Sequence, residues 1–540
     1  MFNQVLNPTG NLGMTVVLAL VPVILLLFML AGLRVTAWLA VLISSVITGL
    51  IAILAWHAPV GDSARAYLYG AGTGIWSIDW ITFWGLIIFN TLMVTGNFDV
   101  FKRWLISQST ADVRVQAILI AWSFGALLEG LVGFGYPWAI VAPLLIPLGI
   151  VEIDALRVAA IANNAPVSYG ALGVPIVTLA AVTGLPLLAV SASVGRIVAV
   201  LALLPPWVLI YLVSGRKGFR EGWPLAIVGS LAYIAGQFPV SQFLGPYLPD
   251  IVGSLVSFAA LLILLKFWRP KTILGYGGVP VVAGGEALPV EPYEGERSLT
   301  GRQIFMSLMP YLVLVVVVVL GTGPWSPLPA ISLFQAKVLA NSSITHQPVA
   351  ALFNFAPFVG GTFVLISWAV IAVILRVDGA MIRQVFTRTF HQMWGALLVG
   401  PFIFGLAYVF NFSGMAASLA DGFSKIGPAF ILLSPILGWI AVALSGSNTS
   451  ANAIFGAFQT TVGKLLGFPV MLLPSLNSVG AEVGKPVAPQ TASVGVSTSH
   501  FVRNEGEIIR HNMGWTLVVL TYLIVVGLLY YFVLPAAMRL

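Results

Sequence analysis

The stretch Glu129-Gly-Leu-Val-Gly-Phe-Gly-Tyr-Pro137 interrupts an apolar run that extends from about residue 115 to about residue 150. The next apolar run, at about 155–190, is broken by Asn163-Asn-Ala-Pro166 and by Gly173-Val-Pro175. Both runs are longer than the roughly 20 residues that cross a bilayer as a helix. Each must therefore be two spans, a re-entrant hairpin or a broken helix.

The same order of features returns later in the chain. Ser445-Gly-Ser-Asn-Thr-Ser450 interrupts the apolar run at about 428–467, and Asn477-Ser-Val-Gly-Ala-Glu-Val-Gly-Lys-Pro486 breaks the run at about 470–496. Each half of the chain thus has a glycine-rich tip followed by an asparagine-led helix that Pro and Gly break.

The composition is that of a chain that lies mostly in lipid. The 540 residues are 59% hydrophobic and only 8% charged, with a mean hydropathy of +1.00, whereas soluble domains carry roughly 25% charged residues. The chain is expected to be an all-α polytopic membrane protein whose first apolar run, 14–31, is a retained span. The net charge of +7 is then explained by cytoplasmic loops and lipid, so no nucleic-acid partner is expected.

Several kinds of chemistry are excluded. The chain has no cysteine, and its five histidines show no metal-binding spacing. It also has no nucleotide-binding loop, so we expect neither an enzyme nor a bound metal or cofactor.

Positive charge gives the orientation. Placing both termini outside puts most of the 25 Lys and Arg residues in cytoplasmic loops, and the opposite orientation would invert this bias. The interrupted runs at 115–150 and 428–467 then enter the membrane from opposite faces, as inverted repeats do.

We therefore expect two inverted-repeat halves, 1–268 and 304–540, each with a re-entrant hairpin and a broken helix. Residues 269–303, rich in Pro, Gly and Glu, are expected to form a cytoplasmic linker. A second polar connection, 322–357, is expected to be an external loop with at most a short surface helix.

The four breaks indicate a site. Unpaired backbone in hydrocarbon costs several kcal/mol per group, so broken helices persist only where protein or a water-filled cavity covers them. Their N-termini there offer N–H donors to an anion. One break alone would be only a kink, but four in corresponding positions favour a carboxylate site near the midplane.

Three charged residues lie within these segments. Glu129 is the first candidate for a proton carrier; the alternative is a structural partner for a backbone N–H or a lysine. Glu482 is a second proton-coupling candidate, although its spacing equally allows a mutual pair with Lys485. Lys485 is expected to bind an anion, either the substrate carboxylate or a buried glutamate.

Neutral polar residues and glycines at the same breaks suit a hydroxyl and a carboxylate on one small substrate. Any one of these residues could instead satisfy local backbone groups. The candidate substrate-binding residues, besides Lys485, are Gly133, Gly135, Tyr136, Asn163, Asn164, Ser168, Ser447, Asn448, Thr449, Ser450, Asn452, Asn477, Ser478 and Gln490.

Four of these segments together resemble the lactate permease family. They are Glu129–Pro137, Asn164–Ile176, Gly446–Phe455 and Gly484–Gln490, and the resemblance covers essentially the whole chain. It implies uptake of L-lactate, D-lactate or glycolate with a proton across the bacterial cytoplasmic membrane.

The triplet Ser447-Asn448-Thr449 is also similar to hairpin tips of the wider ion-transporter superfamily. That similarity implies a scaffold domain, through which a homodimer could form, and a transport domain that moves as an elevator.

The chain departs from the family pattern at four positions. Tyr136 and Trp138 replace smaller residues, and their rings could narrow the pocket or stack on the substrate. Asn448 stands where some members have Asp, which puts more weight on Glu129 as the proton carrier. Glu482 stands where an uncharged residue is expected.

Two alternatives remain. Carbonyl, Asn, Ser and Thr oxygens at 446–450 could hold sodium, which would make the chain a sodium-coupled organic-acid symporter. A proton-translocating subunit of a redox complex would also be all-helical with buried charge. Such subunits carry charges in several successive helices, however, and here the mid-span charges are only Glu129, Glu482 and Lys485.

Overall fold

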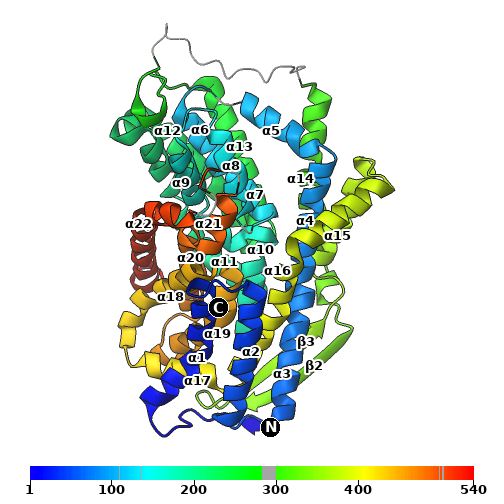
Figure 1. The fold of residues 1–540 in the computed structure, drawn as a ribbon, viewed down its shortest axis with the longest axis vertical. Helices are drawn as coiled ribbons and strands as arrows, with labels where there is room; N and C mark the ends of the chain where they lie inside the picture. The colour runs from blue at the N-terminus through cyan, green and yellow to red at the C-terminus, as the bar shows by residue number, and fades with distance from the viewer. Residues whose placement is uncertain (109, 134, 282–298, 498, 502–503, 540) are drawn as a thin grey trace.

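The computed structural model describes residues 1–108, 110–133, 135–281, 299–497, 499–501 and 504–539 (Figure 1). Within these residues, ten helices are long and apolar enough to cross a membrane, and one bent helix pair could add an eleventh span. The chain is therefore a multi-pass helical membrane protein.

The elements before the linker are β1 (Phe2–Asn3), α1 (Leu12–Ala31), α2 (Ala37–Leu54), α3 (Val60–Thr73), the π-helix η1 (Gly74–Asp79), α4 (Trp80–Val94), α5 (Asn97–Ser107), α6 (Val113–Gln116), the π-helix η2 (Ala117–Phe124), α7 (Gly125–Leu131), α8 (Tyr136–Leu145), α9 (Glu152–Ala162), the 3₁₀ turn η3 (Val167–Tyr169), α10 (Gly170–Thr183), α11 (Leu187–Leu201), α12 (Pro205–Phe243), α13 (Pro249–Phe267) and η4 (Tyr276–Gly278).

The elements after it are α14 (Gly301–Thr322), η5 (Leu328–Ala330), β2 (Phe334–Asn341), β3 (Pro348–Phe355), α15 (Gly360–Ile374), α16 (Gly379–Ser413), α17 (Met415–Ser424), η6 (Gly427–Ala429), α18 (Phe430–Ser445), α19 (Asn448–Leu466), α20 (Leu472–Gly484), η7 (Lys485–Val487), α21 (Pro489–Gly495), α22 (Glu505–Phe532) and η8 (Pro535–Met538).

The expectation of an all-helical chain is wrong in the connection 322–357. This segment contains a β-hairpin, β2 paired antiparallel with β3, and β1 adds a short parallel strand to β2. The sequence of β2, Phe-Gln-Ala-Lys-Val-Leu-Ala-Asn, begins with polar and apolar residues in alternation, which suits a half-buried strand. The sheet lies at one end of the molecule, and α5 and α6 lie at the other (Figure 1).

Helices from the two halves pack side by side. α10 contacts α19, α11 contacts α20, and α9 contacts α22, so segments almost 300 residues or more apart meet in the interior. On the other side of the molecule, the long helix α16 packs along α2, α3 and α4. The chain breaks lie where α7, α10 and α20 come together.

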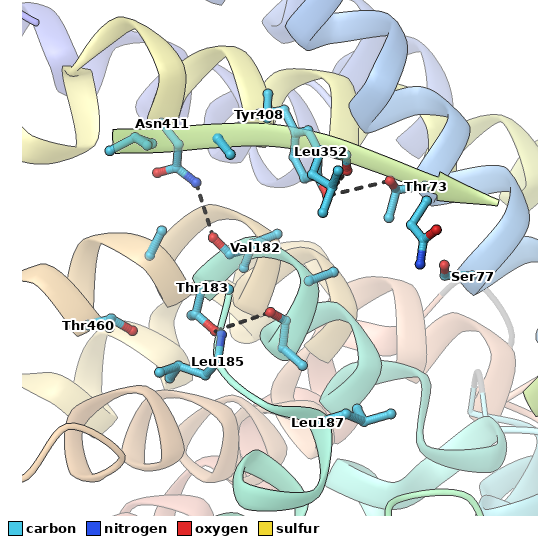
Figure 2. A pocket seen from close by; sticks show the side chains of 18 of the residues that line it. Thr73, Ser77, Val182, Thr183, Leu185, Leu187, Leu352, Tyr408, Asn411 and Thr460 are labelled. Carbon is cyan, nitrogen blue, oxygen red and sulfur yellow. Dashed lines mark hydrogen bonds between the residues drawn. The ribbon is translucent and has the colours of Figure 1, made fainter. Parts of the chain in front are cut away.

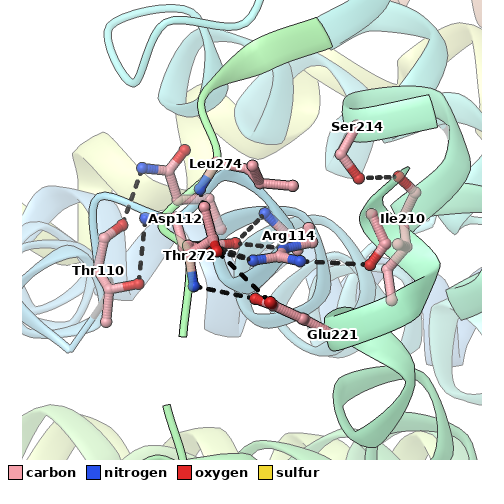
Figure 3. A network of polar contacts seen from close by, with 10 residues as sticks. Thr110, Asp112, Arg114, Ile210, Ser214, Glu221, Thr272 and Leu274 are labelled. Atoms are coloured by element: carbon pink, nitrogen blue, oxygen red, sulfur yellow. Dashed lines mark hydrogen bonds and ion pairs between the residues drawn. The ribbon is translucent and has the colours of Figure 1, made fainter. Parts of the chain in front are cut away.

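A buried ion pair holds the first residues of the linker against the helices (Figure 3). Arg114 Nη2 lies 2.6 Å from Asp112 Oδ2, and both side chains are essentially inaccessible. The same arginine donates to the carbonyls of Thr272 and Gly218, and Asp112 accepts from the N–H of Leu274. Residues 282–298 of the expected linker lie outside the described residues.

Candidate functional site

The two glycine-rich tips lie close together. α7 and α8 are joined through Gly133 and Gly135, and α18 ends at Gly446; all three glycines have positive φ, between +65° and +81°. A Cβ built on Gly135 would lie 3.1 Å from Thr491 Cγ2, and one on Gly446 would lie 3.3 Å from Thr491 Oγ1. Both tips therefore contact the same residue at the start of α21.

The first broken helix has an unusual backbone. The axes of residues 152–162 and 167–183 differ by 66°. Ala171, Leu172 and Gly173 all adopt left-handed conformations, with φ of 47°, 59° and 75°. Such a conformation costs roughly 1–2 kcal/mol for each residue that is not glycine. The chain therefore bends sharply within the run 155–190, and a strained left-handed turn follows the bend.

Lys485 and Glu129 form a buried ion pair across the two halves. Lys485 Nζ lies 2.5 Å from Glu129 Oε1, and the side chains are 7% and 2% exposed. Glu129 Oε2 accepts a 2.7 Å hydrogen bond from the Asn163 amide. A Cβ on Gly170 would lie 2.4 Å from Glu129 Oε1, so a larger residue there would displace the carboxylate. The alternative of a structural lysine partner for Glu129 is therefore realised in this conformation.

Glu482 binds across to the other broken helix. Its Oε2 accepts from the backbone N–H of Ser168 at 3.1 Å and from the Ser168 hydroxyl. The side chain is fully buried, and Oε1 has no hydrogen-bond partner among the described residues. Lys485 pairs with Glu129, so the pair with Glu482 that the spacing allowed does not form.

Several candidate residues hydrogen-bond to each other and join helices. The Asn452 amide donates to the Pro175 carbonyl and to Ser478 Oγ, each at 3.0 Å. Asn477 donates to Asn452 Oδ1 and accepts from Gln459 Nε2. These contacts join α10, α19 and α20, and the side chains are already satisfied by protein.

The hairpin tip 446–450 is also held internally. Ser447 Oγ caps α19 by accepting from the backbone N–H and the hydroxyl of Ser450. Thr449 is partly exposed, and the exposed Gln490 packs against Gly446. Tyr136 is partly buried, with its ring 6.5 Å from that of Phe89.

Three of the candidate site residues are buried and have polar atoms without a partner among the described residues. Neither amide atom of Asn164 has a hydrogen-bond partner among the described residues, and Oδ1 of Asn448 and Oε1 of Glu482 also lack one. These side chains are at most 5% exposed. Because an unpaired buried polar atom is costly, these atoms are available for hydrogen bonds to water or to a polar ligand.

Asp250 is a buried carboxylate that the sequence did not indicate as a site residue. It is 1% exposed, its Oδ1 accepts a 2.8 Å hydrogen bond from the Tyr233 hydroxyl, and its Oδ2 has no partner among the described residues. A Cβ on Gly130 would lie 2.8 Å from Asp250 Cβ, so the start of α13 packs closely against α7 at the residue that follows Glu129. In the sequence, a carboxylate just after Pro249 indicates only a favourable charge in the first turn of a helix.

Comparisons with known proteins cover nearly the whole chain. The family model described as L-lactate permease matches residues 15–535. Glycolate permease GlcA of Escherichia coli (strain K12) is 35% identical over 98% of both chains. The L-lactate permease of Bacillus subtilis (strain 168) is 31% identical over 96% of both chains. Among solved structures, the YdaH transporter of Alcanivorax borkumensis aligns with a TM-score of 0.47 at 16% identity, over 92% of this chain and 97% of that chain.

Proposed function

Because the chain belongs to the L-lactate permease family, we propose that it imports lactate, and related 2-hydroxy monocarboxylates such as glycolate, together with protons across the bacterial cytoplasmic membrane. Its relatives are permeases, and it is a transporter and not an enzyme. The observation that carries the proposal is the buried pair of Lys485 and Glu129 between the chain breaks. The cation of this pair suits a substrate carboxylate, and the anion suits a proton.

Coupling follows from competition for Lys485. While Glu129 is ionised it holds the ammonium group, and the substrate finds no free cation. When Glu129 takes up a proton, the substrate carboxylate replaces it beside Lys485. The pair is neutral in both states, which avoids an uncompensated charge in the membrane interior. Protonation without substrate would leave Lys485 buried and unpaired, so the empty carrier does not leak protons.

The unpaired atoms of Asn164, Asn448 and Glu482 support a site for the 2-hydroxyl group and the second carboxylate oxygen. An amide N–H of Asn164 can donate to a carboxylate, and the acceptor oxygens of Asn448 and Glu482 suit a hydroxyl donor. Glu482 is also the second candidate for proton coupling. The other polar candidates, such as Asn452 and Asn477, then orient the helices that carry the site.

We further propose that residues 1–268 and 304–540 are inverted repeats that form a scaffold and a moving transport domain, with both termini outside. In support, a hairpin tip followed by a broken helix occurs twice: α7–α8 before α9–α10, and α18–α19 before α20–α21. The distribution of positive charge supports entry of the two hairpins into the membrane from opposite faces.

The test is uptake of labelled lactate and glycolate into proteoliposomes with an imposed pH gradient in sodium-free buffer. We expect accumulation that follows the gradient and collapses when a protonophore is added. If uptake appears only when sodium is supplied, proton coupling is wrong and the oxygens at 446–450 become the candidate sodium site.

A further inference from the structure

A large cavity lies apart from the buried ion pair (Figure 2). Its volume is about 900 Å³. Strand β3 and the helices α3 and α16 form one wall, and the opposite wall comes from the end of α10, the start of α11 and the second half of α19. The amide of Asn411 spans the two walls and donates to the Val182 carbonyl at 3.3 Å.

This cavity opens to water. Strand β3 lies at the edge of its sheet, and an open sheet edge cannot lie in hydrocarbon because its backbone groups would stay unpaired. The residues that connect β2 to β3 also line the cavity, including Ser342, Thr345 and Gln347. The end of the cavity beside the sheet is therefore in the aqueous phase.

The lining suits an anion that stays hydrated. Lys464, in the last turn of α19, is the only charged residue among the described residues that line the cavity. It is exposed, and no ion pair to it is found in the described part of the chain. Hydroxyl and amide side chains such as Thr183, Asn354 and Thr460 share the lining. The volume is near the upper end of ligand pockets, roughly 300–1,000 Å³, and far exceeds a three-carbon acid.

One turn of backbone lies between the cavity and the ion pair. Pro246 lines the cavity, and a Cβ on Gly173 would lie 2.2 Å from its carbonyl oxygen. Two residues before Gly173, the Cβ of Ala171 lies 3.1 Å from the position that a Cβ on Gly133 would take. That position on Gly133 is in turn 3.5 Å from Glu129 Oε1. The left-handed turn 171–173 is thus the barrier, and strain of this kind is found at segments that switch.

We propose that this cavity is the entrance vestibule for the substrate, a small organic anion drawn in by Lys464, and that the strained turn 171–173 is the inner gate to the Glu129–Lys485 site. The proposal rests on the proposed transport function and adds to it the route of entrance. A charged group in a walled cavity raises the local concentration of the opposite charge.

The chain contains no cysteine, so single introduced thiols can be followed in the otherwise unchanged full-length protein. Thr461→Cys, at a partly exposed residue of the cavity lining, reports on the vestibule. Ala171→Cys reports on the gate, and Thr9→Cys, which is exposed and outside the cavity lining, is the control. Intact cells are treated with membrane-impermeant thiosulfonates, one anionic and one cationic, with and without excess lactate.

We expect Thr461→Cys to react from outside. The ratio of its rate with the anionic reagent to its rate with the cationic reagent should be several-fold higher than the same ratio for Thr9→Cys. Lys464→Gln should remove this preference, and lactate should slow the reaction. Ala171→Cys, 8% exposed here, should react slowly at rest and faster during turnover.

Two outcomes overturn the vestibule even if pH-driven uptake is found: reaction of Thr461→Cys only in inside-out vesicles, or a charge preference that survives Lys464→Gln. Equal resting rates for Ala171→Cys and Thr461→Cys overturn the gate. Labelling as expected in a protein that shows no pH-driven uptake would instead refute the proton coupling alone.

Discussion

Replacing Glu129 with glutamine tests the competition for Lys485. The substitution keeps the size of the side chain but removes the charge that lies 2.5 Å from Lys485 Nζ. Removing one partner of a buried ion pair costs roughly 3–5 kcal/mol. Because the amide oxygen can still accept from the lysine, we expect a loss of about 3 kcal/mol in the free energy of unfolding, the lower end of that range.

Lactate should restore most of this loss, because its carboxylate replaces the missing anion. A ligand at a hundred times its dissociation constant stabilises the folded state by about 2.7 kcal/mol. The affinity should also change its pH dependence. Because the proposed wild-type mechanism binds one proton with each lactate, each unit of pH increase should weaken lactate binding about tenfold, or by about 1.4 kcal/mol. In Glu129→Gln the affinity should not vary with pH.

Both effects can be measured on the purified protein in detergent. Thermal unfolding is followed by tryptophan fluorescence, to which 16 tryptophans contribute, and lactate affinity is measured by calorimetry from about pH 6 to about pH 8, where lactate stays ionised. Equal pH slopes in the wild type and the variant would refute the reasoning. So would a Glu129→Gln protein that lactate stabilises no more than it stabilises the wild type.

Three further substitutions have defined outcomes. Gly170→Ala would place a methyl group 2.4 Å from Glu129 Oε1, so pH-driven uptake should fall at least about tenfold, a barrier increase of about 1.4 kcal/mol; near-normal uptake would contradict the packing. Arg114→Met leaves Asp112 buried without its cation and should lower unfolding stability by about 3–5 kcal/mol, measured by thermal unfolding; a loss under about 1 kcal/mol would contradict the network. Burial, and secondly a hydrogen bond to a carboxylate, raise the pKa of Tyr276 from 10.0 to about 12. The contribution of the neutral phenol to the stability of the folded state is therefore complete below pH 10.0 and is lost as the pH rises towards about 12. Tyr276→Phe should remove this part of the alkaline stability loss, and an unchanged alkaline profile would show that another group causes it.

The chain breaks could be predicted because their signals are local. Gly, Pro and Asn within long apolar runs indicate a broken helix whatever packs around it. The pairing of Glu129 with Lys485 could not be predicted, because the two residues are 356 positions apart. The spacing on one helix allowed Glu482 as the partner, and only the packed structure shows that Glu482 binds Ser168 instead.

The hydrogen-bond partners of the asparagines could not be predicted either. The sequence indicates polar groups in a membrane interior but not which of them satisfy each other. Asn452 and Asn477 do so, whereas Asn164 has both amide atoms unpaired among the described residues. The β-hairpin is hard to predict from the sequence, because Pro and polar residues surround its strands and make the segment resemble a loop. The alternation at the start of 334–341 was the available signal.

The central claim is that Glu129 carries the proton that accompanies the substrate. The most direct measurement follows proton and labelled lactate fluxes together in sodium-free proteoliposomes, for the wild type and for Glu129→Gln. We predict that the wild type accumulates lactate against its gradient with protons entering alongside, and that the variant exchanges lactate for lactate but moves no protons. Gradient-driven accumulation that persists in Glu129→Gln would contradict the account.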